Sequence, residues 1–507
     1  MSYENPIKGR GLKLTDYLSK PSVPRQASKA FEALAGLYHS RYGKERKTFK
    51  LYDGKLGDEL FPFLKWMAKK FPVNKKVLQA LKDSIADKKF TKGFYKPGLL
   101  FETLEGFFSK DKKVRITDPH FVAAKQRIVD MIVPDQYLKP REIKKGMNLK
   151  KNLTTLSTSA GFMNYGKKKK HVTRYMINGG LELKRLIASG VSFYKIWIPP
   201  YVALTRSQIG AASKDLQYVA PVDDDGMYKY KGRLVWCQDA VMTLFESQYA
   251  RPLINYLAKA WPNIAMGKSP DYIRDQMVRM RQECLEWYSS DFSKYDSTIP
   301  AQLIREAFDI VKMCFPPETH RELDFICVKF IEAEILMPDL EIYSVAKGVK
   351  SGSYFTQVIG SIVNALMLLT FLEHRYGHYQ VKKYGDKQHI YGNTLDNVFR
   401  LRDGRYMFSI LGDDNAFALK DRIDFRAFAK YVKKTFGVII NADKSTQGDF
   451  TQAIEYLKRG WTPEGEERDC ADLCINMIHP ERPRTYENYS PWHIIFGYYL
   501  TYRRSME

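Results

Sequence analysis

Cysteine and long apolar runs are scarce in this sequence of 507 residues. The six cysteines follow no disulfide spacing, which indicates reduced thiols in an intracellular protein. Cys470, Cys474 and His479 would supply only three ligands of a zinc site, and no fourth completes a recognisable pattern. The first residues, MSYENPIKGRGLKL, contain no apolar core, so we expect no signal peptide. The longest apolar run, 359–372, is too short to cross a bilayer and predicts a buried helix.

Basic residues outnumber acidic ones. Lys and Arg number 81 against 57 Asp and Glu, which gives a net charge of +24 and a pI near 9.4. Such an excess indicates a polyanionic partner, most often nucleic acid. Each basic stretch by itself is typical of a solvated loop. Their recurrence at 110–115, 144–151 and 166–174, with Tyr165 and Tyr175 nearby, favours a charged channel that holds a nucleic-acid strand.

The chain is 44% hydrophobic and 14% aromatic, enough for a large core and two to four domains. Hydrophobic periodicity predicts helices over 62–71, 101–108, 271–287, 301–335, 353–376 and 424–435, strands within 193–204 and 215–236, a short strand and turn after 285, and a hairpin over 406–419. The DDDG at 223–226 is typical of a turn rather than a metal cluster. Without a Gly/Ser linker or repeat, we expect one interlocked body.

The hairpin contains the stretch SILGDDNAFAL, residues 409–419. Gly, Asp and Asn tolerate the backbone angles of a tight turn, so Asp413 and Asp414 could be turn residues. They could equally hold a metal ion at the hairpin tip. Chance alone gives a GDD in about one chain in ten of this length, so the triplet cannot decide between the two interpretations.

A second pair of carboxylates lies upstream, in SSDFSKYDST. Asp291 follows an apolar strand, LEWYSS, and Asp296 comes five residues later. Two carboxylates from separate strands, Asp291 and Asp413, would suit two divalent cations that clamp a phosphoryl transfer. Between the pairs, Ser351 and Gly352 are expected to open a helix, with a capping hydroxyl and free backbone N–H groups.

In this order and at these separations, Asp-x4-Asp, SGxxxT and GDD resemble motifs A, B and C of viral RNA-dependent RNA polymerases. Four further stretches resemble motifs G, F, D and E of that family: STSAG (157–161), YKGRLVW (230–236), NADKST (441–446) and EYLKRGW (455–461). The resemblance covers about residues 157–461. The wording of SGSYFTQVIGSIVN and DFSKYDST is most similar to polymerases of small double-stranded RNA viruses, picobirnaviruses first and partitiviruses second.

The resemblance implies transfer of nucleotides from NTPs to an RNA 3′-hydroxyl, with two Mg²⁺ or Mn²⁺ ions as cofactors. The implied catalytic and metal-binding residues are Asp291, Asp413 and Asp414, with Lys444 as the general acid to pyrophosphate. The implied NTP-binding residues are Lys231, Arg233, Asp296, Ser351, Gly352, Thr356 and Asn364. The implied RNA-binding residues are Ser159, Gly161, Lys167, Lys168, Lys169, Arg206, Lys214, Lys458 and Arg459.

Two positions depart from the family pattern. Many members have an Asn four residues after the motif B Thr, where it helps to read the ribose. Here that position is Gly360, and Asn364 lies one helical turn, about 6 Å, further along. Which residue takes the role of that Asn is therefore open. Motif F is also blurred, since Arg206 and Lys214 both could provide its second basic contact.

The implied fold is α+β, a right-hand polymerase fold with an antiparallel palm sheet. We expect an N-terminal extension that bridges fingers and thumb (1–90), fingers (91–262), palm with motif A (263–309), an insertion (310–345), palm with motifs B to E (346–461) and a small thumb (462–507). Expected partners are template and product RNA, NTPs and a viral capsid protein, with no membrane. The protein is expected to be a monomer of the virion interior and host-cell cytoplasm, and to start RNA chains without a primer.

Two other classes of function stay open. A reverse transcriptase-like polymerase would share the palm motifs. In reverse transcriptases, however, a bulky aromatic that blocks a 2′-hydroxyl stands five residues after the first Asp, where this chain has Asp296. A non-catalytic basic RNA-binding protein would account for the charge and the aromatics, but not for the ordered acidic motifs.

Asp296 leads to a first prediction. Its carboxylate can accept a hydrogen bond from a ribose hydroxyl, and a site that bonds a hydroxyl discriminates against analogues without it. Asp296→Ala should therefore erode the preference for NTP over dNTP, measured as the ratio of kcat/KM values. An unchanged ratio would show that this assignment is wrong.

Overall fold

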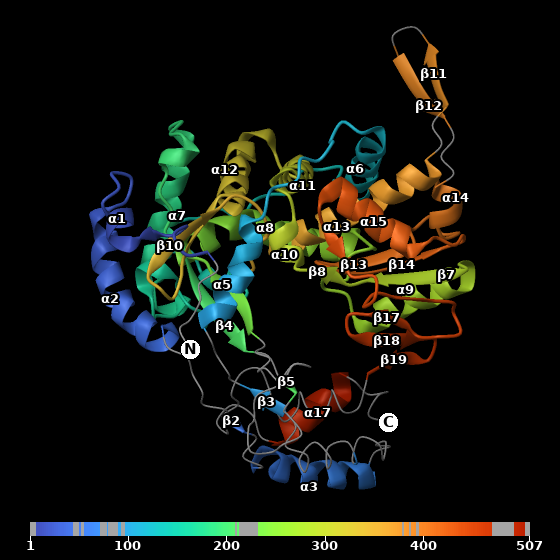
Figure 1. The fold of residues 1–507 in the computed structure, drawn as a ribbon, viewed down its shortest axis with the longest axis horizontal. Coiled ribbons are helices and arrows are strands. Elements are labelled where there is room, and N and C mark those ends of the chain that lie inside the picture. Colours follow the sequence, from blue (N-terminus) through green and yellow to red (C-terminus); the bar gives the residue numbers. More distant parts are fainter. Residues whose placement is uncertain are drawn as a thin grey trace.

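A four-stranded antiparallel sheet lies at the centre of one half of the molecule, at the right in Figure 1, in the order β13-β14-β7-β16. The computed structural model describes residues 7–43, 50–51, 55–70, 79, 90–92, 97–207, 210–211, 232–377, 380–384, 387–391, 395–468 and 491–501. The strands of this sheet are β7 (Glu286–Ser290), β13 (Phe408–Leu411), β14 (Asp414–Leu419) and β16 (Thr446–Gly448). Residues on both faces of β13 and β14 are buried, so the sheet is covered on both sides.

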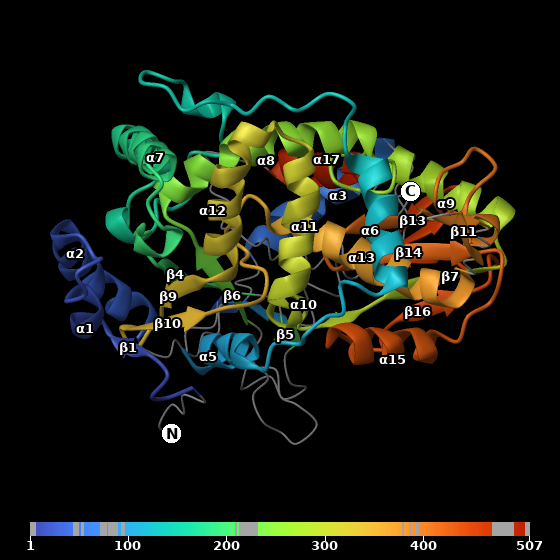
Figure 2. The same ribbon diagram turned by 90° about the horizontal axis from the view of Figure 1, so that it is seen from above.

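Helix α13 (Thr356–Tyr376) is the buried axis of this half. It packs against β13 and against three helices, α6 (Pro119–Ile132), α11 (Ala301–Met313) and α15 (Phe425–Phe436) (Figure 2). Among the described residues it is the one helix that is long and apolar enough to cross a membrane, but 89% of its most apolar window is buried inside the protein. The predicted buried helix is therefore confirmed.

The other elements of this half are short or lie at its edge. They are α9 (Pro270–Glu283), α10 (Tyr295–Thr298) and α14 (Leu395–Phe399), and the strand pair β8 (Phe292–Ser293) with β15 (Ile439–Ile440). Side-chain caps define where several helices begin. The Asp118 and Ser269 side chains accept hydrogen bonds from the first turns of α6 and α9, and a proline follows each cap. Helix α15 ends at Gly437, whose φ of 75° is the left-handed conformation common at that position.

The other half contains a five-stranded sheet in the order β1-β10-β9-β4-β6. Its strands are β1 (Leu12–Lys13), β4 (Tyr201–Ser207), β6 (Gly232–Cys237), β9 (Ala333–Leu336) and β10 (Glu341–Val345). β4 and β9 pair in parallel, and the other neighbours are antiparallel. The helices here are α1 (Leu14–Leu18), α2 (Arg25–Tyr42), α5 (Pro97–Glu105), α7 (Thr173–Ala188), α8 (Ala240–Ala260) and α12 (His320–Ile331).

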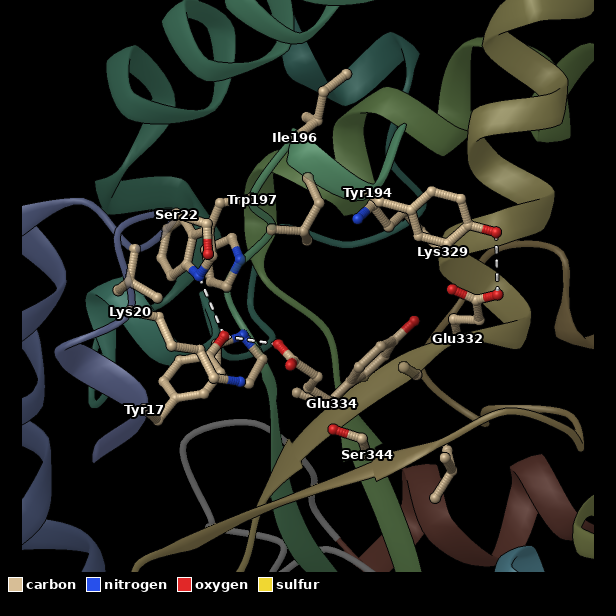
Figure 3. Close-up of a pocket in the computed structure, with 17 residues that line it drawn as sticks. Tyr17, Lys20, Ser22, Tyr194, Ile196, Trp197, Lys329, Glu332, Glu334 and Ser344 are labelled. Atoms are coloured by element: carbon tan, nitrogen blue, oxygen red, sulfur yellow. Dashed lines mark hydrogen bonds between the residues drawn. The ribbon is translucent and has the colours of Figure 1, made fainter. Parts of the chain in front are cut away.

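The N-terminal segment docks on this second sheet. The Tyr17 hydroxyl donates to Glu334 Oε2 at 2.6 Å and accepts from Trp197 Nε1 at 3.1 Å (Figure 3). The Tyr38 hydroxyl donates to the Ala203 carbonyl at 2.7 Å. A cavity of about 270 Å³ remains between these elements, and none of the residues predicted to act in catalysis or binding lines it.

Smaller elements lie at the periphery. They are the sheet β2-β3-β5 (Lys50–Leu51, Phe90–Lys92, Gly210–Ala211), the hairpin β11 (Gln380–Tyr384) and β12 (Lys387–Tyr391), the sheet β17-β18-β19 (Ile454–Tyr456, Arg459–Thr462, Gly465–Glu467), and the 3₁₀ turns η1 (Gly106–Phe108), η2 (Leu149–Lys151), η3 (Phe162–Asn164), η4 (Lys169–His171), η5 (Phe193–Lys195) and η6 (Pro317–Thr319).

The N-terminal and C-terminal parts of the chain meet. Helix α3 (Lys55–Lys70) packs against α17 (Pro491–Thr501), below the body of the molecule in Figure 1. Leu64 and Met67 of α3 are buried, as are Ile494 and Ile495 of α17. This contact is what an N-terminal bridge to the C-terminal part requires. That it helps to enclose a channel stays a prediction, as do the domain boundaries.

Several predicted elements are confirmed, and three differ. The hairpin, α13 and α15 are present. The predicted helix over 301–335 is two helices, α11 and α12, and residues 333–345 form the hairpin β9–β10. Local periodicity could not predict this hairpin, because its partner strand β4 lies more than a hundred residues earlier in the chain. Residues 193–195 form a 3₁₀ turn rather than a strand. Helix α13 starts at Thr356, so Ser351 and Gly352 do not open it. The predicted turn at 223–226 and the residues Cys470, Cys474 and His479 lie outside the described residues.

Arg127 provides a test of the packing around α13. From α6 its guanidinium contacts Glu373 and Tyr406 and lies 2.6 Å from Asp396 Oδ1, and the Glu373 side chain is fully buried. Arg127→Ala would leave that carboxylate buried without its charge partner. We expect a loss of about 3–5 kcal/mol of unfolding free energy, measured by urea denaturation.

Arg185→Ala is the matched control, because it removes an exposed pair with Glu182 on α7. Its expected loss is much smaller than that of Arg127→Ala, because water screens an exposed pair. Equal losses in the two variants would contradict the role given to Arg127.

Candidate active site

The turn between β13 and β14 presents Asp413. Leu411 pairs with Asp414, which leaves Gly412 and Asp413 as a two-residue hairpin turn. Gly412 has a φ of 67°, and a glycine with positive φ at the first turn position is typical of a tight hairpin. Asp413 and Asp414 are both exposed. The two interpretations of GDD therefore coexist, since the turn is real and it presents the carboxylates.

The register of β14 against β7 brings the upstream carboxylate to the same place. Asn415 pairs with Ser290, so the neighbouring residues Asp414 and Asp291 stand at adjacent strand ends. Although Asp414 is exposed at the strand end, desolvation by nearby protein atoms and then the charges of Asp413 and Asp291 raise its pKa to about 6, while Lys458 and Arg233 act in the opposite direction. The three predicted metal-binding aspartates thus form one electrostatic cluster.

Asp296 and Arg233 lie near Asp413 of this cluster. Both line a cavity of about 430 Å³ together with Asp413. Desolvation by the surrounding protein, and then the Asp413 charge, raise the pKa of Asp296 to about 6, and Arg233 lowers it. Lys294 lines the same cavity in a left-handed conformation, with a φ of 53°. The sequence analysis assigned no role to Lys294, although a basic residue between the two aspartates of DFSKYD was a usable signal.

Arg206 lies beside Arg233, on the neighbouring strand. The two arginines pair directly across β4 and β6. Like charges directly opposite each other repel, and a bound anion would relieve that repulsion. This places one of the two candidates for the second basic contact beside Arg233. Lys214, the other candidate, and Lys231 lie outside the described residues.

A second cavity, of about 950 Å³, also borders the cluster. Asp291 and Asp414 line it with the predicted residues Lys444, Lys458 and Arg459. The loop of Lys444 is tied to the cluster, because the Asp291 backbone N–H donates to Ser445 Oγ at 3.0 Å. Lys458 lies in a tight turn in which it and Leu457 have φ values of 57° and 55°. Each such non-glycine residue stores about 1–3 kcal/mol of strain.

A third cavity, of about 710 Å³, collects the predicted residues Ser159, Lys169, Ser351, Gly352 and Thr356. It joins the STSAG loop to the start of α13. The basic residues Lys167 and Lys168 are exposed beside it on the same loop, where Ser159 forms a bridge with Lys168. The predicted RNA-binding stretch is therefore adjacent to the motif B segment.

The hydroxyls of motif B already have partners within the protein. Ser351 Oγ accepts from the Trp236 backbone N–H at 3.2 Å. Thr356 Oγ1 donates to the carbonyls of Lys350 and Ser353 at 2.5 and 2.8 Å. These bonds shape the loop, and the predicted helix-capping role of Ser351 is wrong.

Close backbone approach explains two of the glycines. A Cβ on Gly352 would lie 1.8 Å from the Trp236 carbonyl oxygen, so the loop can lie against β6 only with glycine there. Gly161 has a φ of 86°, and a Cβ there would lie 2.5 Å from Asp239 Cα. Both residues therefore serve to fit the loops together, and their contact with nucleotide or RNA stays a prediction.

Asn364 is not in any of these cavities. Its side chain is fully buried beneath the Asp413 turn, and its amide is hydrogen-bonded to Gly412, Asp413 and Asn415. The structure therefore places Asn364 beneath the turn, apart from the cavities that the other predicted site residues line. The physical reason is the extra helical turn that separates it from position 360.

The cluster can bind hard divalent cations only if further ligands, such as waters or phosphate oxygens, complete the coordination. Asp291, Asp413 and Asp414 offer carboxylate oxygens, the ligands that Mg²⁺ prefers. Within the described ranges, no three His, Cys, Asp or Glu side chains converge closely enough to hold an ion by themselves. Mg²⁺ commonly binds to one or two carboxylates plus waters and substrate phosphates, so this arrangement fits a cation that arrives with a phosphate ligand.

Comparisons with known proteins agree with this geometry. A family model described as viral RNA-dependent RNA polymerase matches residues 224–483. The RNA-directed RNA polymerase of Cryptosporidium parvum virus 1 (strain KSU-1) is 31% identical over 144 residues, 27% of this chain and 26% of that protein. The genome polyprotein of Ljunganvirus 1 is 25% identical over 224 residues, 43% of this chain and 8% of that protein. The chain thus matches about a quarter or less of the length of these relatives.

Two solved structures are similar over nearly the whole chain. The RNA-dependent RNA polymerase of a human picobirnavirus has a TM-score of 0.60 at 14% identity, covering 92% of this chain and 82% of that one. Its insertion loop deletion mutant has a TM-score of 0.62 at 15% identity, covering 93% and 86%. At these identities the likeness shows the fold. The expected right-hand polymerase fold is confirmed.

The raised pKa of Asp414 predicts a pH-dependent stability. Asp ordinarily titrates near 3.8, and here the pKa is about 6, so ionisation is less favourable in the folded state. Protonated Asp414 therefore contributes to the stability of the fold at low pH. The wild type loses that contribution as pH rises from about 4 to 6 and lacks it at higher pH. Asp414→Asn should raise the unfolding temperature at pH 7.5 in EDTA by roughly 1–2 °C, because exposure screens the repulsion.

The gain should vanish near pH 4. Asp443→Asn, at an exposed residue of the loop that follows β15, is the control and should show no such pH-dependent gain. A gain for Asp414→Asn that is the same at pH 4 and pH 7.5 would contradict the charge cluster.

Proposed function

Because the chain belongs to the viral RNA-dependent RNA polymerase family, we propose that it copies RNA templates by transferring nucleotides from NTPs to an RNA 3′-hydroxyl. One observation carries this proposal. The β7–β14 register assembles Asp291, Asp413 and Asp414 between a cavity with Arg233 and Asp296 and a cavity with Lys444. A basic RNA-binding protein without catalysis would have no use for carboxylates clustered beside basic side chains.

Asp291 and Asp413 are the residues that would hold two Mg²⁺ or Mn²⁺ ions, supported by Asp414. When bound, such ions lower the pKa of the attacking hydroxyl and neutralise charge on the phosphates. The chain's own residues do the rest. Arg233, backed by Arg206, would orient the triphosphate through its fork of donors. Asp296, in the same cavity, would accept a hydrogen bond from the ribose.

Lys444 would donate a proton to the departing pyrophosphate. It is exposed in the cavity that Asp291 and Asp414 also line. A positioned proton donor contributes about 10²–10⁴-fold to such a reaction. The template would follow the basic loop of Lys167 and Lys168, and product RNA would follow Lys458 and Arg459.

Membership of the family motivates a proposal for the biological role and location of this reaction. We propose a role in replication and transcription of a viral double-stranded RNA genome, started without a primer. The protein would act as a monomer inside the virion and in the host-cell cytoplasm, in contact with capsid protein. The N-terminal segment that packs against α17 through α3 would help to enclose the RNA channel.

The test is incorporation of labelled UTP on a single-stranded RNA template, without primer, with four NTPs and Mg²⁺ or Mn²⁺. Asp413→Ala should lower the rate by about 10³-fold, because it removes several kcal/mol of charge stabilisation from the transition state. Asp130→Ala, at an exposed residue of α6, is the matched control and should leave the rate unchanged.

Each failure has a distinct meaning. No product from the wild type, with or without an annealed primer, would favour the non-catalytic RNA-binding protein. A preference for dNTPs would favour the reverse transcriptase-like alternative. Equal activity of Asp413→Ala and wild type would refute the assigned site.

A further inference from the structure

The turn that carries Asp413 is held from below by side chains of α13. Ser361 Oγ accepts from the Gly412 backbone N–H at 2.8 Å. Asn364 Nδ2 donates to the Gly412 carbonyl at 2.9 Å and to the Asp413 carbonyl at 3.2 Å. Three backbone groups of a two-residue turn are thus bonded by two side chains, one helical turn apart.

The same network reaches the other catalytic strand. Asn364 Oδ1 accepts from Asn415 Nδ2 at 2.8 Å, and Asn415 Oδ1 accepts from the Ser290 backbone N–H at 3.2 Å. Ser290 directly precedes Asp291. A continuous series of hydrogen bonds therefore links α13, the Asp413 turn and the end of β7.

All three side chains of this network are inaccessible to solvent. Ser361 and Asn364 have no exposed surface and Asn415 has 1%. Buried polar networks in which every member has its partners rigidify a structure and fix one arrangement. These residues are therefore placed to set the geometry of the carboxylates rather than to touch a substrate.

An amide is chemically suited to this position. The Asn364 side chain must donate to two carbonyls and accept from another amide, which a carboxylate or an apolar side chain cannot do. A Lys or Arg could donate to the carbonyls, but its charge would repel the cations that the three aspartates attract. A neutral amide holds the turn without changing the charge of the site.

The helix surface at Gly360 explains why the amide is found at 364. A Cβ on Gly360 would lie 3.5 Å from Gly412 Cα and 3.8 Å from the Tyr295 ring, and the Tyr295 hydroxyl donates to the Gly360 carbonyl at 2.6 Å. The helix therefore already touches the turn at 360. Asn364, one helical turn further, is the side chain that donates to the carbonyls of the turn.

We propose that Asn364, with Asn415 and Ser361, is a positioning residue that fixes Asp413 relative to Asp291 for catalysis, and that it does not read the ribose. The proposal rests on the proposed polymerase function. It concerns geometry alone, so its signature is a loss of turnover with substrate binding preserved.

The main variant is Asn364→Asp, nearly the same shape but unable, when ionised, to donate to the two carbonyls. A displacement of about 1 Å at a reacting centre reduces rates about 10²-fold, so kcat should fall by about that factor. The KM for NTP, the Kd for template RNA and the NTP/dNTP ratio should stay within about twofold of wild type. Thr370→Val is the matched control, because Thr370 is buried on the same helix and its hydroxyl donates only to the Leu366 carbonyl.

Hydrogen exchange supplies a readout that needs no activity. The Gly412 amide should exchange at least tenfold faster in Ser361→Ala, which removes its acceptor, and the 408–419 segment should lose protection in Asn364→Asp and Asn415→Ala. Thr370→Val should change neither exchange there nor kcat. If Asn364→Asp does not fold, Ser361→Ala and Asn415→Ala carry the same test of kcat.

The outcomes separate the inference from the function on which it rests. An inactive wild type would overturn the proposed function, while the exchange data would still judge the network. An active wild type with normal kcat in the network variants would overturn the inference. So would a raised KM for NTP or a reduced NTP/dNTP ratio at unchanged kcat, since either would make Asn364 a nucleotide contact.

Discussion

Repulsion between like charges is the constraint on which this structure depends. Asp291, Asp413 and Asp414 stand at the ends of paired strands, and desolvation together with the neighbouring carboxylate charges raises the pKa of Asp414. A fold that holds such a cluster must fix the backbone against it, because the carboxylates themselves favour separation until cations arrive. The β7–β14 register does this on one side and the buried contacts of α13 do it on the other.

Helix α13 therefore has two tasks. Its apolar residues fill the core between α6, α11 and α15. The free energy of this burial offsets the unfavourable repulsion and strain at the charged site. Ser361 and Asn364 point at the turn. The loop that leads into the same helix fits against β6 through Gly352, so these contacts relate the Asp413 turn to the strand that carries Arg233.

Local chemistry made much of this predictable. The GDD hairpin, the strand before Asp291, α13 and α15 follow from turn residues and periodicity, and the ordered motifs indicated the fold. The features that the sequence could not predict depend on contacts between residues far apart in the chain. The β9–β10 hairpin needs β4 as a partner, and the bonds of Ser351 and Thr356 depend on how the loop lies against β6. The bonds of Asn364 likewise depend on the turn that packs above it, although its partner Asn415 directly follows the GDD.

The most direct test of the central claim is a structure of the protein with template RNA, an annealed primer, a non-hydrolysable NTP analogue and Mg²⁺. We expect two ions bound to carboxylate oxygens of Asp291 and Asp413, and the ribose 2′-hydroxyl bonded to Asp296. Ions bound without one of these two carboxylates, or RNA seated away from the three cavities, would contradict it.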